Sequence, residues 1–520
     1  MPDTTTRPAR APARARAATP LTFAHLALAA LVLLAPTVGI AQSLAVRVQR
    51  VIDAADIGNA RVGICIREVG ASAPLVFLDA DSGYIPASNM KLLTSGAALR
   101  ILGPDFVFRT EIAIDSDRVI VRGSGDPALA DPEVLRNTEP RMTVQDFLDT
   151  LAAAVAERTP DGCSEILIDD RVFDREFVHP TWDPDDLNKR YAPEVAGLNF
   201  HGNLLAIFAS PSPQGPGNPP RLAIQPSSTW IGIENRARTV SKNNNTYWAS
   251  RDPKSNQFRV FGDVRSTAPL PLNTPTHDNP LLFGHLLTER LMSKGIAVGG
   301  ASHPGLNPPA VVRVAGPDES LPDGTLCAVV TTPLQEILNR CNTDSVNLYA
   351  EALLKRIGYE VTREAGSWAN GASVLRMTLE EQLGPDAAIS TIVVDGSGLS
   401  HSNLVTPRTL VDWIESLATD PELRDPFLLS LATPGRGTFT RRFRDSDLQN
   451  HVAGKSGVLT GVRSLSGIVI APNGREIIFS VLVNDVPSGK GPNTTRMAER
   501  IVEQIDSYLS QLVGTAQYGG

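Results

Sequence analysis

The sequence predicts an α/β (α+β) fold in which one mixed unit is interrupted by a long β-rich insert. Three observations support this prediction. Helical and strand patterns occur near both ends of the chain, and short alternating strands dominate its middle. The chain has 520 residues, of which 42% are hydrophobic, and this length is sufficient for more than one domain. We find no repeat of fixed period.

The first mixed part combines two helices with a strand hairpin. Residues 43–58 predict a helix, and residues 61–69 and 74–80 predict two strands joined by a Gly/Ala/Ser turn. Residues 84–103 predict a second helix that ends at Gly103. Its apolar residues recur at helical spacing, at Met90, Leu93, Ala97 and Ile101.

The middle of the chain has a different residue pattern. Short strands begin at residues 107–122 and are separated by Pro-rich breaks at residues 209–220, 266–275 and 302–309. We therefore expect a β-rich region inserted into the mixed unit.

Helices and a final hairpin follow the insert. Thr332 is predicted as the N-cap of a helix with a capping box, and residues 345–358 predict the next helix, ending at Gly358. Residues 464–472 and 476–485 form a hairpin pattern, and residues 492–512 predict the last helix.

The N-terminus has the composition of a secretory signal peptide. A basic flank at Arg7, Arg10, Arg14 and Arg16 precedes an apolar run from Leu26 to Ala35, which is too short to span a bilayer. The small residues Gly39 and Ala41 predict cleavage after Ala41, so that no transmembrane helix remains. An uncleaved anchor helix is the alternative, and both readings predict export.

Charge and cysteine content exclude two classes of protein. The net charge of −8 argues against non-specific nucleic-acid binding, which needs a basic surface. Four widely spaced cysteines, Cys65, Cys163, Cys327 and Cys341, do not match a metal-binding pattern. They permit three pairings into disulfides, but we favour buried free thiols.

Ser88 and Lys91 are the first candidates for catalysis. Residues three apart on a helix share a face, with Cβ atoms about 5–6 Å apart. A neutral Lys91 amine can accept the Ser88 hydroxyl proton and make the serine a nucleophile. The lysine pKa must then fall by about 3 units, roughly 4 kcal/mol, through an apolar environment or a second cation. A surface lysine is the alternative, because Ser-x-x-Lys alone is a weak signal.

Two further motifs follow in order. Ser345 and Asn347 stand at a predicted helix start, where hydroxyl and amide groups can face a site. Lys455, Ser456 and Gly457 precede the final hairpin, and a strand with a cation, a hydroxyl and a glycine suits an extended peptide with a carboxylate.

Together, Ser-x-x-Lys, Ser-x-Asn and Lys-Ser-Gly form the signature of the penicillin-recognising serine enzymes. The segment between Ser88 and Ser345 is far longer than the segment between the first two motifs of β-lactamases. In this respect the chain resembles the class C low-molecular-mass penicillin-binding proteins, the D-alanyl-D-alanine carboxypeptidase/endopeptidase family. The stretches at residues 123–129 and 394–407 agree with that family, and the resemblance covers most of residues 45–510.

The resemblance implies a role for each motif residue. Ser88 attacks the carbonyl of the penultimate D-alanine and becomes an acyl-enzyme, and Lys91 is the activating base. Ser345, assisted by Lys455, relays a proton to the leaving amine. Asn347 holds Lys91 and the substrate amide.

The third motif is implied to bind the substrate. Ser456 and Lys455 receive the terminal carboxylate, and Gly457 lets two backbones approach. The backbone N–H groups of Ser88 and Val458 form the oxyanion hole. Two positions depart from the family pattern: Val346 replaces Asp or Asn, and Ser456 replaces Thr.

The residue pattern and the resemblance together predict a division of the chain. Residues 1–41 are the signal peptide, and residues 42–105 and 311–514 are the two parts of a transpeptidase-like domain, an antiparallel sheet flanked by helices. Residues 106–310 are the inserted β-rich region, with two subdomains expected, and residues 515–520 are a C-terminal tail.

The expected function is hydrolysis of the D-alanyl-D-alanine bond of peptidoglycan stem peptides in the periplasm. Cleavage of D-alanyl-diaminopimelate cross-links is an open second activity. We expect inhibition by β-lactams, no metal or other cofactor and no nucleic-acid partner, and leave a homodimer open. The alternatives are a β-lactamase or esterase of the same superfamily and a non-catalytic wall-binding protein.

Some residues are expected to be structural. A Ser-His-Asp hydrolase is disfavoured, because His201 and His401 lie outside any Gly-x-Ser-x-Gly context. Asp126 and Asp395 are predicted to cap turns, and residues 395–400 to form a rigid turn beside the site.

Overall fold

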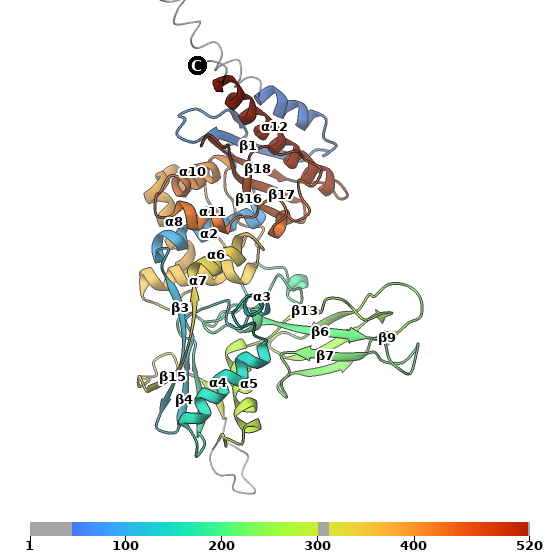
Figure 1. Ribbon diagram of the computed structural model, residues 1–520, viewed down its shortest axis with the longest axis vertical. Coiled ribbons are helices and arrows are strands. Elements are labelled where there is room, and N and C mark those ends of the chain that lie inside the picture. The colour runs from blue at the N-terminus through green and yellow to red at the C-terminus, as the bar shows by residue number, and fades with distance from the viewer. Residues whose placement is uncertain (1–43, 300–310, 518–520) are drawn as a thin grey trace, which may run out of the picture.

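A computed structural model describes residues 44–299 and 311–517 (Figure 1). The predicted signal peptide, the third Pro-rich break and the last three residues of the predicted tail lie outside the described residues. In the described ranges, no helix has the length and apolar character needed to cross a membrane.

The first layer of the fold is a five-stranded antiparallel sheet in the order β16-β17-β18-β1-β2. Strands from the two ends of the chain meet in it, since β1 pairs with β18 from Arg61 opposite Asn484 to Glu68 opposite Ile477. The strands are β1 (Arg61–Glu68), β2 (Val76–Leu78), β16 (His451–Leu459), β17 (Val462–Ile470) and β18 (Glu476–Asn484).

Both faces of this sheet are covered, because side chains alternate between two cores. Ile64 and Ile66 point to a core shared with the helix at residues 44–53 and with α12 (Gly491–Gln517). Cys65, between them, points to the opposite core. Figure 1 shows α12 along the outer face of the sheet.

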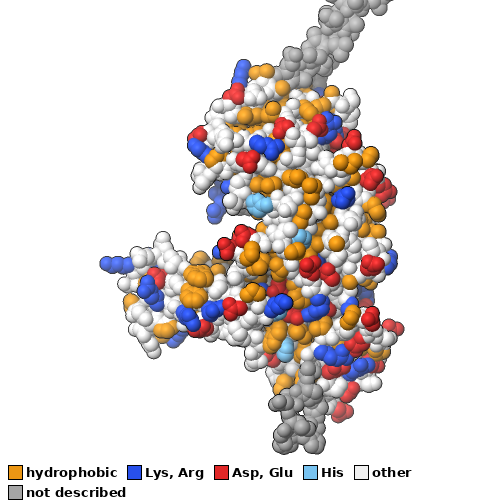
Figure 2. All heavy atoms as spheres, turned by 180° about the vertical axis from the view of Figure 1, so that it is seen from behind, with side chains coloured by type: hydrophobic (Ala, Val, Ile, Leu, Met, Phe, Trp, Pro, Cys, Tyr) orange, Lys and Arg blue, Asp and Glu red, His pale blue; other side chains and the backbone are white. Residues whose placement is uncertain are grey.

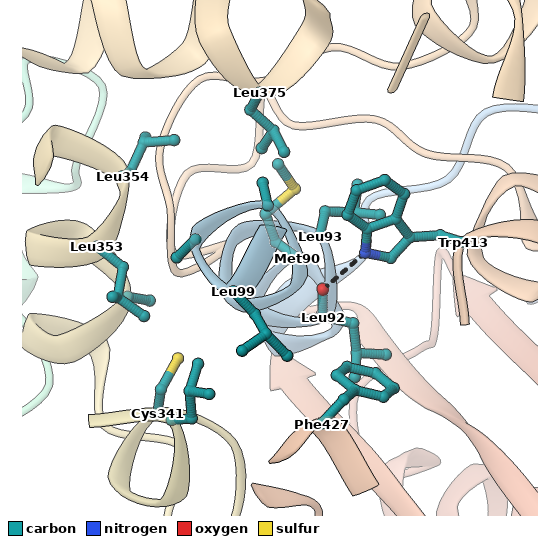
Figure 3. Close-up of a cluster of buried hydrophobic side chains, with 14 of the residues drawn as sticks. Met90, Leu92, Leu93, Leu99, Cys341, Leu353, Leu354, Leu375, Trp413 and Phe427 are labelled. Atoms are coloured by element: carbon teal, nitrogen blue, oxygen red, sulfur yellow. Dashed lines mark hydrogen bonds between the residues drawn. The ribbon is translucent and has the colours of Figure 1, made fainter. Parts of the chain in front are cut away.

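The second layer is a group of helices on the other face of the sheet. They are α2 (Met90–Leu102), α6 (Leu334–Asn342), α7 (Asn347–Thr362), α8 (Trp368–Leu383), α9 (Pro385–Ile389), α10 (Pro407–Ala418) and α11 (Arg424–Ser430). Helix α2 lies at the centre and is buried on all sides from Met90 to Leu99. In Figure 3 it is seen end-on, surrounded by side chains of neighbouring helices, and the Trp413 indole donates to the Leu92 carbonyl at 2.9 Å.

The insert contributes a second five-stranded sheet, in the order β14-β5-β4-β3-β15. Its strands are β3 (Val107–Asp115), β4 (Arg118–Arg122), β5 (Glu165–Asp169), β14 (Val312–Val314) and β15 (Thr325–Pro333). Helices α4 (Val144–Arg158) and α5 (Asn279–Ser293) pack against it, and α3 (Pro132–Arg136) is short.

A smaller group of strands forms an arm that projects from the body. Figure 2, from behind, shows a hollow between this arm and the upper body. The arm contains three small sheets. The first is formed by β6 (Leu204–Ser210), β7 (Arg221–Gln225) and β13 (Leu272–Pro275), and the second by β8 (Gly232–Asn235), β10 (Trp248–Arg251) and β11 (Gln257–Phe261). The third is formed by β9 (Arg238–Thr239) and β12 (Asp263–Val264).

The α/β fold class is confirmed, and several local predictions need correction. The insert holds two long helices, α4 and α5, that the sequence analysis missed. Thr332 is not an N-cap: β15 runs on to Pro333, and the Thr332 hydroxyl donates to Asp126 at 2.6 Å. Helix α7 continues past Gly358 to Thr362.

Two further expectations concern the insert boundary and the cysteines. Strands β14 and β15 pair with β5 and β3, so the sheet of the insert extends beyond the predicted boundary at residue 310. The domain division otherwise stays a prediction. All four cysteines lie in the described ranges and are free thiols.

The packing of α2 predicts the effect of Gly96→Ala. An added Cβ would lie 2.6 Å from both the Trp413 Nε1 and the Leu417 Cδ1 atoms. Alanine favours a helix by about 1 kcal/mol, whereas overpacking costs about 1–3 kcal/mol. We expect net destabilisation, measured as the free energy of unfolding in denaturant. The exposed control Met377→Ala should change this free energy by less than about 0.5 kcal/mol.

Candidate active site

Ser88 lies on a single 3-10 turn, Ala87–Asn89, that leads directly into α2. The backbone of Ala87 has a φ of +47°, a left-handed conformation that is uncommon for residues with a side chain. The Ser464 hydroxyl donates to the Pro86 carbonyl at 2.7 Å and ties the turn to β17. The serine is thus held between the central helix and the sheet.

Asn89 provides a second link between this turn and the sheet. In the amide orientation that satisfies both ends of its side chain, the nitrogen donates to the Lys455 carbonyl at 2.9 Å and the oxygen accepts from the Ser466 backbone N–H at 3.2 Å. The amide therefore fixes the start of α2 against both β16 and β17.

Lys91 is completely buried and its amine points at Ser88. Its Nζ donates to Ser88 Oγ at 3.1 Å, to Asn347 Oδ1 at 2.7 Å and to the Ser397 carbonyl at 2.9 Å. The surface-lysine alternative is therefore wrong. Three hydrogen bonds fill the donor capacity of a lysine ammonium and aim the amine at the serine hydroxyl.

Burial lowers the pKa of Lys91 to about 8. Removal from water penalises the charged form, while Cys341, Glu351 and Asp395 oppose the shift. A large neutral fraction near pH 8 is what a base needs.

Lys455 is the second cation near Lys91, and repulsion between the two positive charges disfavours protonation of both amines. Burial is the main cause of the fall in the pKa of Lys91. The pKa of Lys455 is itself held well below its ordinary range, by burial first and by the charge of Lys91 second.

Ser345 and Lys455 form a second hydrogen-bonded pair. Lys455 Nζ donates to Ser345 Oγ at 2.7 Å and to the Ser456 carbonyl at 2.9 Å. Ser345 precedes α7 with a φ of +62°, and this conformation directs its hydroxyl at the lysine. The pair couples a hydroxyl to an amine of lowered pKa, the same combination that Ser88 and Lys91 make.

Strand β16 brings its outer edge to Ser88. Gly454 exchanges both backbone hydrogen bonds with Ala432 across this edge. Backbone N–H and C=O groups alternate in direction along an antiparallel strand. The backbone groups of Ser456 and Val458 therefore point to the same edge of β16 as those of Gly454. Gly457 lies against the serine turn: an added Cβ would come within 2.8 Å of the Ser88 nitrogen. The backbone N–H groups of Ser88 and Val458 thus belong to adjoining segments.

Asn347 joins the insert to the site. Its Oδ1 accepts from Lys91, and its Nδ2 donates to the Tyr191 carbonyl at 2.7 Å. Tyr191 lies in the insert, and its role was missed because a backbone carbonyl has no sequence signature. The Ser397 carbonyl was missed for the same reason, although its turn was expected beside the site.

The turn at residues 395–400 lies beside Lys91, is buried and is held by hydrogen bonds within the turn. The Asp395 carboxylate accepts from the Gly398 N–H at 2.8 Å and the Ser400 N–H at 2.7 Å. It also accepts from the indole of Trp182 in the insert at 2.9 Å. Asp126 caps another turn through the Ala128 N–H.

His201 and His401 have no part in this arrangement. His201 is buried, with its Nδ1 2.8 Å from the Leu204 carbonyl, and His401 is exposed. In the described part of the chain, no group of three or more His, Cys, Asp or Glu side chains is placed to hold a metal ion.

The structure therefore brings all three motifs together. Ser88, Lys91 and Asn347 form one connected group, and Ser345 and Lys455 form the other. Ser456 and Gly457 are buried in β16, whereas the Val458 side chain is 56% exposed. This geometry supports acyl transfer to Ser88, with two lysines placed to move protons.

Comparisons with known proteins agree with this geometry. A model of the D-Ala-D-Ala carboxypeptidase 3 (S13) family matches residues 44–507. A D-alanyl-D-alanine carboxypeptidase of Actinomadura sp. (strain R39) is 31% identical over 489 residues, covering 88% of this chain and 85% of that protein. The protein is also similar to the D-alanyl-D-alanine carboxypeptidase DacB of Haemophilus influenzae, at 22% identity, covering 86% of this chain and 91% of the relative.

The fold is also found among solved structures. The crystal structure of penicillin binding protein 4 (dacB) from Haemophilus influenzae has a TM-score of 0.69 and 20% identity, covering 89% of this chain and 99% of that chain. A second structure of it, complexed with a novel β-lactam, has a TM-score of 0.66 and 19% identity, covering 88% and 99%.

The contact between β16 and the serine turn predicts the effect of Gly457→Ala. The new methyl group would collide with Ser464 Oγ and crowd the Ser88 nitrogen, so the strand must move away from Ser88. A displacement of this kind costs about 100-fold in rate. We expect that loss in the rate at which Ser88 reacts with an acylating reagent. The exposed control Thr460→Ala, three residues along, should react at the wild-type rate.

Proposed function

The chain belongs to the D-Ala-D-Ala carboxypeptidase 3 (S13) family, and from this premise we propose that Ser88 is the nucleophile of a serine D,D-peptidase and Lys91 its base. One observation carries the proposal: the buried amine of Lys91 hydrogen-bonds to Ser88 Oγ at 3.1 Å while its pKa is lowered to about 8.

The acylation step follows from this contact. Neutral Lys91 takes the proton of Ser88 Oγ, and the oxygen attacks the carbonyl carbon of the penultimate D-alanine. A C–O bond forms, and the developing oxyanion accepts from the backbone N–H groups of Ser88 and Val458. Such donors are typically worth about 10²–10³ in rate. Their placement is supported by the contact of Gly457 with the Ser88 nitrogen.

Expulsion of the terminal D-alanine needs a proton on its nitrogen. Ser345 gives its hydroxyl proton to the leaving amine as the C–N bond breaks, and Lys455 replaces that proton. The 2.7 Å hydrogen bond between Lys455 Nζ and Ser345 Oγ supports this relay. Water then attacks the acyl-enzyme, the ester bond to Ser88 breaks, and the shortened peptide leaves.

Substrate recognition is assigned to the edge of β16. The terminal carboxylate is received by the Ser456 hydroxyl and by the charge of Lys455 when it is protonated. The substrate backbone lies beside Gly457, where only hydrogen fits. Asn347 reaches the substrate amide from the opposite side. Val346 lies between Ser345 and Asn347 and does not replace a group used in these steps.

The natural substrate is proposed to be the stem peptide of peptidoglycan, reached in the periplasm after export. Family membership supports the substrate, and the predicted signal peptide at residues 1–41 supports the compartment. β-Lactams are proposed to acylate Ser88, since the carboxypeptidase relatives include a protein named penicillin-sensitive and a similar fold is solved with a β-lactam.

Penicillin labelling tests the nucleophile. A labelled penicillin is expected to form a long-lived adduct with the wild type and none with Ser88→Ala, because the proposal places the acyl group on Ser88 Oγ. Mass spectrometry of the adduct checks the site. Labelling of Ser88→Ala would refute the assignment, and rapid turnover of penicillin would instead identify a β-lactamase.

Digestion of purified muropeptides tests the substrate. We expect release of D-alanine from pentapeptide stems and cleavage of D-alanyl-diaminopimelate cross-links, because the open edge of β16 accepts an extended chain on either side of the bond. Products separated by mass report both. Release of D-alanine without cleavage of cross-links would show that the protein is a carboxypeptidase only. If neither product forms and penicillin gives no adduct, the protein is a non-catalytic wall-binding protein.

A further inference from the structure

Glu351 is a completely buried carboxyl group on the same helix face as Asn347, one turn further along α7. Three donors converge on it: the Gly396 N–H at 2.9 Å, the Ser397 N–H at 2.8 Å and the Trp368 indole at 2.8 Å. A carboxylate accepts at both oxygens, so it satisfies all three donors at once, whereas an amide offers only one accepting oxygen.

The turn that Glu351 holds is the one whose carbonyl contacts the base. The Ser397 carbonyl accepts from Lys91 Nζ at 2.9 Å, and the Gly396 carbonyl accepts from Thr94 Oγ1 at 2.8 Å. Gly398, at φ +79°, lies against the Ala87 carbonyl in the serine turn. The turn therefore fills the space between α7, α2 and the nucleophile.

We propose that Glu351 is a positioning residue for Lys91: its carboxylate fixes the turn at Gly396 and Ser397, so that the Ser397 carbonyl holds the lysine amine towards Ser88. This inference rests on the proposed function of Lys91. It gives α7 two connections to the base, a direct one through Asn347 and an indirect one through Glu351.

Glu351 also acts on the base by its charge. The charged or titratable groups that face it are Lys91 from α2, Cys341 from α6, Lys355 from its own helix and Asp395 from the turn. Burial, followed by repulsion from Asp395, raises the pKa of Glu351 to about 7. When ionised, Glu351 favours the ammonium form of Lys91 and so raises the pKa of the lysine.

The charge of Glu351 sets the direction in which its removal shifts the pH profile of acylation. The acid limb of the acylation profile reports loss of a proton from Lys91, with a wild-type midpoint near pH 8. Glu351→Gln removes the negative charge, so the pKa of Lys91 falls and the midpoint moves to lower pH. The amide also leaves one backbone N–H without an acceptor, so the turn loosens and the maximal rate falls.

The experiment measures the acylation rate with a fluorescent penicillin as a function of pH. For Glu351→Gln we expect a maximal rate reduced by about 10- to 100-fold and a midpoint at lower pH. For Glu351→Asp, which keeps the charge, we expect a reduced rate with the wild-type midpoint. The matched control is Glu360→Gln on the same helix, whose carboxylate pairs with Arg356 away from the site and whose loss should change neither quantity.

The outcomes separate the two proposals. A wild-type rate and midpoint in Glu351→Gln would overturn the positioning role, and so would a reduced rate with an unshifted midpoint and a lowered melting temperature. If Glu351→Gln does not fold, the Glu351→Asp variant decides, and a wild-type rate there overturns the role. Absence of labelling in wild type, or labelling of Ser88→Ala, would refute the function of Lys91 itself.

Discussion

The amine of Lys91 is held by acceptors from three segments that lie far apart in the sequence. Ser88 lies on the turn that leads into α2, Asn347 opens α7, and Ser397 lies in a turn of the second half of the chain. The contacts with Asn347 and Ser397 need the helical layer to close around α2, because these residues lie far from Lys91 in the sequence. The environment of the Lys91 amine is therefore a product of the complete core, and its lowered pKa depends on how well that core excludes water.

Burying a lysine is costly, and the fold offsets the cost with hydrogen bonds and with nearby carboxyl groups. Glu351 and Asp395 favour the charged amine, while burial favours the neutral one. The result is a pKa of about 8, close to neutrality, where a lysine can both take and return a proton. The pKa of Lys455, buried nearby, is also held well below its ordinary range, by burial first and by the charge of Lys91 second. Each of the two lysines is therefore an amine of lowered pKa that is hydrogen-bonded to a serine hydroxyl.

Much of this architecture is readable in the sequence. The patterns at residues 61–69 and 476–485 predicted two strands that the structure pairs in the central sheet, the family resemblance implied the sheet itself, and the three motifs predicted which side chains meet. The sequence did not predict that Lys91 is buried. In a half-exposed helix, polar residues on one face show which residues point to the core, but α2 is buried on nearly every side and has no polar face. Helix α4 did carry a signal, a capping box of Thr143 and Asp146, which the Pro-rich breaks elsewhere in the insert outweighed. Thr332 was misassigned because its hydroxyl satisfies Asp126 instead of a helix end.

The insert has a consequence for how this protein is divided. Its Tyr191 carbonyl satisfies the amide of Asn347, and its Trp182 indole satisfies the carboxylate of Asp395. Lys355 on α7 is anchored to Asp174 in the same segment at 2.6 Å. An insert joined to its host in this way is not a detachable module. Its excision would leave the polar groups of Asn347, Asp395 and Lys355 without these partners, so the insert and the peptidase unit are expected to evolve as one body.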